Sequence, residues 1–154
     1  MPLLLLFYVV GELLSWASAI GPIQYAAVER SGIEIIFKFS SAESGLSRKL
    51  SHLNCLIGNA SINDFIVLDH GMNWTGAIED TGQGSGVFFY KASGIAHMID
   101  DGRWSLPSGD KIAQELSDKK IVRCRVVQGG YVGKPVVSPE MVVPVRDIIE
   151  LYRN

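Results

Sequence analysis

The chain has 154 residues, of which 47% are hydrophobic and 19% are charged, and its formal net charge at pH 7 is −2. This length favours a single domain, and the apolar fraction excludes a disordered chain. The small net charge excludes the strongly basic surface that nucleic-acid binding requires, so no nucleic acid is expected as a partner.

Residues 1–19 have the pattern of a signal peptide. The apolar run from Leu3 to Val10 is too short to span a bilayer, and Ala17 and Ala19 supply the small-x-small pattern of a signal-peptidase site. The alternative is a buried N-terminal strand or helix. No later segment approaches the ~20 apolar residues of a transmembrane helix. We therefore expect a secreted chain or one at the extracellular face of the cell, with its domain at 20–154 and no transmembrane segment.

The first half of the domain is predicted to consist of strands. Ile33, Ile35, Phe37 and Phe39 alternate with other residues, a period of two that places them on one face of a strand. Short apolar runs at 65–68 and 87–90 suit buried strands. Between these runs, Gly82, Gly84 and Gly86 indicate a flexible turn.

The second half follows the same pattern. Val122, Cys124 and Val126 share one strand face, and a glycine pair then marks a hairpin turn. Residues 135–145 return as an extended strand, in which Pro139 and Pro144 suit an edge position or a bulge. Two segments, 109–117 and 147–152, fit either a short helical turn or a strand. Short strands separated by turn signals predict an all-β sandwich or barrel.

The chain has two cysteines, Cys55 and Cys124, and both follow the signal sequence. An even number of cysteines in an exported chain predicts a disulfide, and closing a loop of about 70 residues stabilises a fold by roughly 4 kcal/mol. Two buried free thiols are the alternative. Asn59-Ala60-Ser61 and Asn73-Trp74-Thr75 match the N-glycosylation pattern, so Asn59 and Asn73 are candidate glycan sites.

Three segments in the second half of the chain carry motifs. The run 118–126 places an acid six residues before Cys124 on an alternating strand. Upstream, 102–110 contains Leu106-Pro107-Ser108-Gly109, and downstream, 137–146 is rich in valine and contains Pro139 and Pro144. In chain order, 102–110, 118–126 and 137–146 resemble the leucine-proline-x-glycine turn before strand E, strand F and strand G of the first immunoglobulin domain of the Down syndrome cell adhesion molecule (Dscam) family.

This resemblance implies an immunoglobulin-like β-sandwich in which the disulfide joins the two sheets. Residues 87–94 would then form strand C. They lie much farther from Cys55 than the family's spacing allows, so 56–86 are interpreted as an insertion. The resemblance also implies cell adhesion or recognition through protein partners, either homophilic or heterophilic.

Catalytic chemistry is not expected. The three histidines are far apart in sequence, and Asp69 and His70, as neighbours on a strand, would point to opposite faces. The acid pairs Glu79-Asp80 and Asp100-Asp101 lie beside glycines and are predicted to be turn residues. The sequence therefore predicts no enzyme, no catalytic or cofactor-binding residues and no metal site.

Two functions remain open on the sequence alone. The first is an extracellular recognition domain, in which Trp104 either contacts a partner or covers one end of the core. The second is a secreted β-barrel carrier of a small apolar ligand, which the apolar strands and single disulfide suit equally well.

Overall fold

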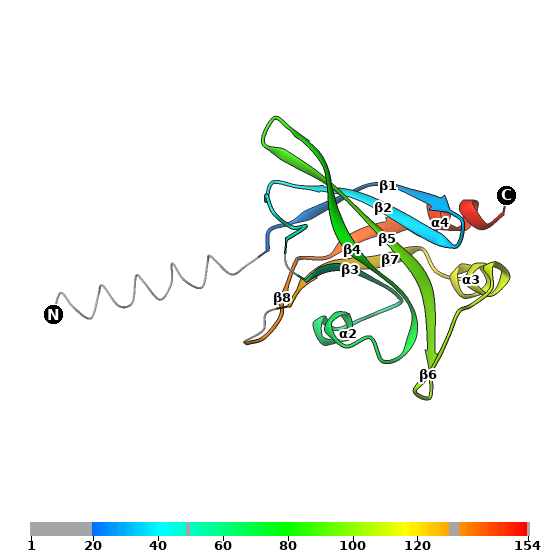
Figure 1. Cartoon of the computed structure of the whole chain (residues 1–154). Helices are drawn as coiled ribbons and strands as arrows, with labels where there is room; N and C mark the ends of the chain where they lie inside the picture. The colour runs from blue at the N-terminus through cyan, green and yellow to red at the C-terminus, as the bar shows by residue number, and fades with distance from the viewer. Residues whose placement is uncertain (1–19, 49, 130–132, 154) are drawn as a thin grey trace, which may run out of the picture.

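The computed structural model describes residues 20–48, 50–129 and 133–153 (Figure 1). The predicted signal peptide, 1–19, lies outside the described residues. The elements in chain order are β1 Ile23–Ser31, β2 Glu34–Ser41, β3 Ser51–Ile57, α2 Ile62–Ile66, β4 Gly71–Gly84, β5 Val87–Asp100, β6 Arg103–Ser105, α3 Gly109–Leu116, β7 Ile121–Gln128, β8 Val136–Val137, β9 Met141–Pro144 and α4 Val145–Tyr152.

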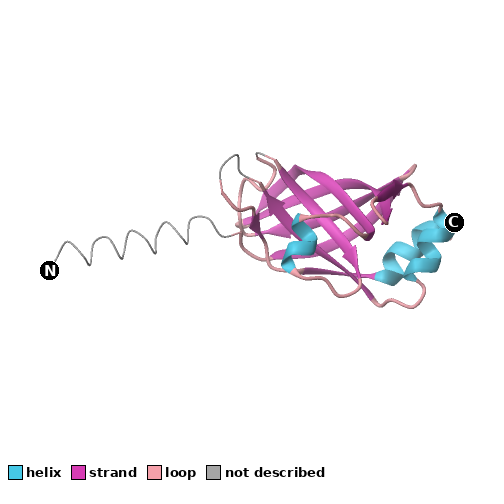
Figure 2. Cartoon of the chain, turned by 90° about the horizontal axis from the view of Figure 1, so that it is seen from below, coloured by secondary structure: helices cyan, strands magenta, loops and turns pink. Residues whose placement is uncertain are grey.

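The strands in the described part of the chain form one antiparallel sheet of nine strands, in the order β1-β2-β5-β4-β3-β7-β8. β9 pairs with β7 beyond the end of β8, and β6 pairs with the end of β5. The sheet curls until β9 contacts β1. Figure 2 shows the strands crossing in two layers, with α3 and α4 together at one end. The prediction of an all-β fold is confirmed, and the two layers are consistent with a sandwich.

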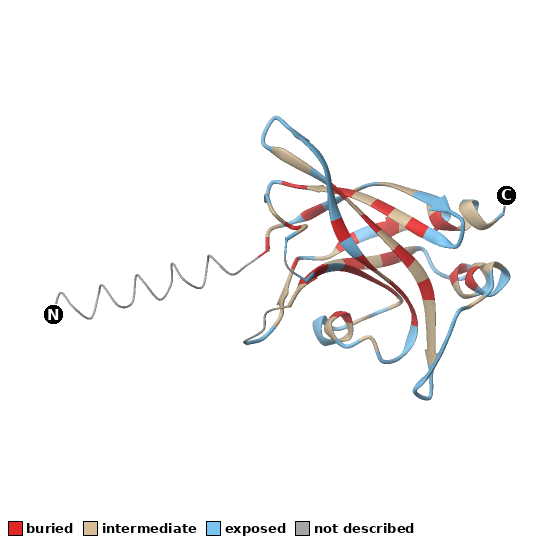
Figure 3. Ribbon diagram, in the orientation of Figure 1, coloured by how far each residue is buried: buried red, intermediate tan, exposed pale blue. Residues whose placement is uncertain are grey.

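The core forms because buried residues alternate with outward-facing residues along the strands. In β2, Ile35, Phe37 and Phe39 are buried, whereas Ile36 and Lys38 between them face outward and are half-buried. The aromatic rings fill the space between the layers, with Phe37 edge-on to Trp74 and Phe39 stacked on Tyr90. In Figure 3 the buried segments accordingly recur at intervals along the strands.

The long β4–β5 hairpin links the two layers, and a glycine pair permits its bend. Gly76 and Gly94 lie where the regular ladder of the two strands is interrupted. A Cβ on Gly76 would lie 2.3 Å from the carbonyl oxygen of Ser93, and one on Gly94 would lie 2.8 Å from that of Thr75. Only glycine therefore lets the two backbones approach this closely.

Two sequence predictions need correction here. Residues 65–68 are not a strand, because 62–66 form helix α2, which begins with a capping box between Ser61 and Asp64. Ile33 does not continue the face of β2, because it lies in the turn after Gly32 and is exposed. The stretch 56–86 contains β4, a central strand of the sheet, and its interpretation as an insertion stays a prediction.

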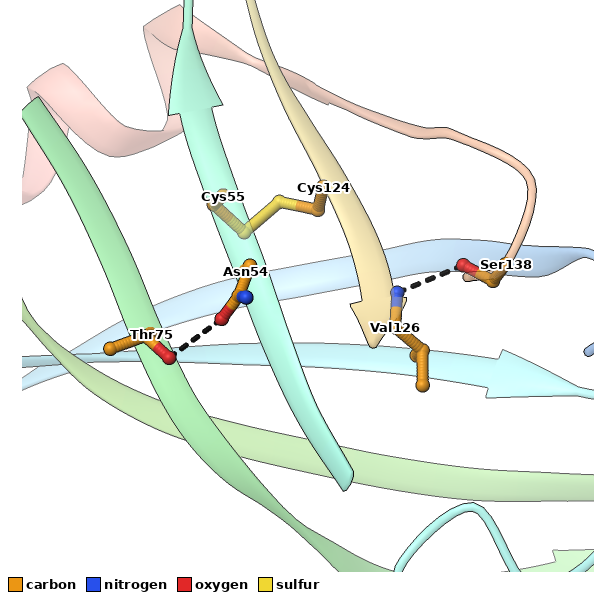
Figure 4. Close-up of a disulfide and its surroundings, with 6 residues drawn as sticks. All are labelled: Asn54, Cys55, Thr75, Cys124, Val126 and Ser138. Atoms are coloured by element: carbon orange, nitrogen blue, oxygen red, sulfur yellow. Dashed lines mark hydrogen bonds between the residues drawn. A yellow bond between two sulfur atoms is a disulfide. The ribbon is translucent and has the colours of Figure 1, made fainter. Parts of the chain in front are cut away.

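The C-terminal predictions hold in part. Of the segment 109–117, all but the last residue form helix α3, and 147–152 lie in α4; the two helices pack against each other. The predicted strand 135–145 is broken into β8 and β9, which are separated by 138–140. The Ser138 hydroxyl accepts a hydrogen bond from the Val126 N–H at 2.8 Å, which satisfies a backbone donor at the break (Figure 4).

Candidate functional site

The predicted disulfide between Cys55 and Cys124 is present. The two residues are direct partners in the ladder between β3 and β7, and both side chains are fully buried (Figure 4). The bond therefore joins neighbouring strands of one sheet and does not connect two sheets as the resemblance implied. Its burial identifies it as a structural bond, since reactive cysteines are partly exposed.

The two candidate glycan sites differ in accessibility. Asn59 is exposed in the connection between β3 and α2. Asn73 lies in β4 and is only 1% exposed, and its Nδ2, the atom to which a glycan would be joined, is buried without a hydrogen-bond partner. A glycan at Asn73 stays a prediction, and this burial argues against it, because a sugar there would have to displace the residues that cover Asn73.

Titratable residues do not converge on a catalytic arrangement among the residues that the structure describes. Asp69 and His70 do touch, contrary to expectation, because they precede β4 in a loop; their 2.6 Å hydrogen bond raises the pKa of His70. Asp101 lies in the β5–β6 turn as predicted, with positive φ. Glu79 instead lies inside β4 and pairs with Lys91.

We call the hollow beside α3 and α4 the end cleft. Its volume is about 100 Å³, and its lining includes Ile33, Ile95, Leu106, Pro107, Ile112 and Tyr152. The β1–β2 turn supplies one wall, β5 and the β6–α3 connection supply another, and the two helices close the base. Segments far apart in the sequence thus meet at one end of the sheet, which is why sequence patterns gave no sign of the cleft.

The rim of the end cleft is apolar and exposed. Ile33 is 65% exposed, Leu106 is 53% exposed, and the neighbouring Trp104 is 59% exposed. Trp104 lies on the ring of His97 with 5.1 Å between the ring centroids, and burial lowers the pKa of His97. The sequence had marked Trp104 as either a contact residue or a core cover. Its exposure favours the contact role.

Tyr152, which lines the end cleft, has a buried hydroxyl with unused hydrogen-bonding capacity. The hydroxyl of Tyr152 and the indole nitrogen of Trp74 are buried and neither makes a hydrogen bond. The Trp74 N–H lies near enough to lower the pKa of Tyr152, although burial has the larger, opposite effect. Arg30 lies 4.9 Å from the centre of the Tyr152 ring. A side chain entering the cleft would therefore meet mostly apolar residues, with Arg30 and Tyr152 as the polar ones.

The described residues contain no group of three or more histidine, cysteine or acidic residues placed to hold a metal ion. No helix among them is long and apolar enough to cross a membrane. In comparisons with known proteins, no family model, curated protein or solved structure matches the chain.

Proposed function

We propose that this chain is an exported recognition domain that binds a protein partner at the end cleft. The observation that carries the proposal is that Ile33 and Leu106, two exposed large hydrophobic residues from distant parts of the chain, line one cleft, with the exposed Trp104 two residues before Leu106. Large exposed apolar groups that cluster beside a pocket are typical of binding surfaces, whereas isolated ones are ordinary. The cleft has room for about one aliphatic side chain of a partner.

Export is supported by three features. The buried Cys55–Cys124 disulfide suits an oxidising compartment, and Asn59 is exposed where a glycan could be attached. The signal-peptide pattern in 1–19 is the third. Membership of the immunoglobulin family stays a prediction. The antiparallel pairing of β7 with β9, the segments that resemble strands F and G, supports it.

The alternative, a carrier that encloses an apolar ligand, has less support. The interior where such a ligand would lie is occupied by Phe37, Phe39, Trp74 and Tyr90, none of them more than 1% exposed. A carrier of this kind would need those rings to move apart at a substantial cost in packing.

The test is a binding screen with the protein displayed as a multivalent probe, because single domains of this type bind weakly. The panel consists of cell-surface and secreted ectodomains and includes the protein itself, which separates homophilic from heterophilic binding. Leu106→Asp is expected to abolish the signal. Ile62→Asp is the matched control, because Ile62 is 55% exposed on α2, outside the cleft. Equal loss in both variants, or none in Leu106→Asp, would contradict the proposal.

A further inference from the structure

A second hollow lies on the outer face of the sheet, and we call it the outer hollow. Its volume is about 500 Å³, and its lining includes Glu29, Ile36, Lys38, Thr81, Phe89 and Lys91. It spans β1, β2, β5 and β4 and shares no lining residue with the end cleft. Its size falls within the range of small-molecule sites, roughly 300 to 1,000 Å³.

Two β-bulges border the outer hollow. The β1–β2 ladder shifts register between Tyr25 and Ala27, and the β4–β5 ladder shifts between Asp80 and Gly82. The two residues left out of register, Ala26 and Thr81, both line the hollow. Bulges bend a strand and are frequent beside functional sites. The concave shape thus follows from bends in the strands on both sides of the β2–β5 pair.

Like charges face each other in the floor of the outer hollow. Lys38 and Lys91 are direct partners across β2 and β5, an arrangement that is unfavourable without a compensating anion. Each has one: Lys38 pairs with Glu29, and Lys91 Nζ lies 3.3 Å from a carboxylate oxygen of Glu79. These side chains are all more than a third exposed, so the ion pairs contribute little stability.

The ammonium groups retain capacity for a ligand. Each has three N–H donors, of which a single carboxylate contact occupies one. Glu29 and Glu79 balance the two lysines in formal charge, so the site offers an anionic group the remaining N–H donors of the lysines and not a net positive charge.

An apolar surface adjoins these cations. Phe89 lies two residues from Lys91 on the same strand face and is 44% exposed, and Ile36 lies two residues from Lys38. An exposed aromatic ring in a hollow offers a stacking surface for a flat apolar group. We propose that the outer hollow binds a small organic acid, with its carboxylate between Lys38 and Lys91 and its aromatic body on Phe89.

The test uses 2-naphthoate and its neutral analogue 2-naphthamide as probes, titrated into the purified protein at low salt and followed by chemical shifts in NMR spectra. Naphthoate is expected to bind at least about tenfold more tightly than the amide, because only the acid engages the lysines. The double variant Lys38→Gln/Lys91→Gln is expected to remove that preference, and Phe89→Ser to weaken both probes.

Two controls separate this site from other surfaces. Lys111→Gln removes a lysine of similar exposure that is paired with Glu115 on α3, and it should leave naphthoate binding unchanged. Leu106→Asp, in the end cleft, should also leave it unchanged. No naphthoate binding at millimolar concentration, equal binding of acid and amide, or undiminished binding to a folded double lysine variant would each overturn the proposal.

Discussion

Cys55 and Cys124 lie directly opposite each other on neighbouring strands, with their Cα atoms 4.1 Å apart and both side chains in the interior. On its other side, Cys55 is paired with Trp74 of β4. The disulfide thus holds β7 to β3 in the centre of the sheet, beside the largest residue of the core. We expect its contribution to be to stability, not to chemistry.

Replacing both cysteines by alanine should lower the free energy of unfolding by about 2–5 kcal/mol, because the unfolded chain loses its cross-link. Equilibrium denaturation measures this directly. The double variant is the appropriate comparison, since a single substitution leaves a free thiol. A loss below about 1 kcal/mol would mean that the bond does not constrain the unfolded chain as inferred.

The close approach of β4 and β5 predicts that two glycines of β4, Gly76 and Gly84, differ in how well they tolerate alanine. Gly76→Ala should destabilise the fold by at least about 3 kcal/mol or prevent folding, because its Cβ would lie 2.3 Å from the Ser93 carbonyl oxygen. Gly84→Ala, in the same strand, meets no atom within 4 Å and should change stability by less than about 0.5 kcal/mol. Thermal melts of the two variants test this. Similar losses of stability in both variants would contradict the close approach of the two backbones at Gly76.

Glycan attachment should distinguish the two sequons. When the protein is expressed in eukaryotic cells, Asn59→Gln should remove the glycan mass, whereas Asn73→Gln should leave it unchanged, because Asn73 is buried. Mass spectrometry before and after enzymatic deglycosylation provides the measurement. A glycan on Asn73 in folded protein would show that β4 is not covered as described.

The raised pKa of Tyr152 predicts that the fold loses stability in alkaline solution. Burial raises the pKa of Tyr152, with smaller opposing effects of Trp74 and Arg30. The unfolded chain therefore loses this proton first, and stability falls as the pH rises above about 10. Tyr25 and Tyr90, whose pKa values are also raised by burial, act in the same direction.

Tyr152→Phe should reduce this alkaline loss. At pH 7 it should leave stability unchanged or raise it by up to about 1 kcal/mol, because it removes a buried hydroxyl that makes no hydrogen bond. Urea denaturation at pH 7 and pH 10.5 tests both statements. A clear loss of stability at pH 7 would reveal a hydrogen bond to this hydroxyl.

Local patterns predicted much of the fold. Alternation located β2 and β7, and the even number of cysteines predicted the disulfide that joins β3 to β7. Helix α2 was missed because its five residues include an apolar run, although the Ser61–Asp64 capping box was a usable signal. The placement of the disulfide within one sheet follows from strand order, which alternation does not determine.

The end cleft and the outer hollow could not be predicted from the sequence as the strands could. The end cleft depends on the curl of the sheet, which brings Ile33 near Leu106. The outer hollow depends on the pairing of Lys38 with Lys91 and on bulges at Ala26 and Thr81. Register and bulges arise from pairing between strands, and a single strand's sequence carries little information about them.

Export is the condition on which recognition of an extracellular partner depends. The most direct measurement is non-reducing peptide mapping by mass spectrometry of the protein recovered from the medium of eukaryotic cells. We predict a chain that begins after Ala19 and contains a peptide cross-linked through Cys55 and Cys124. Retention inside the cell with Met1 present and both thiols free would contradict the proposed function.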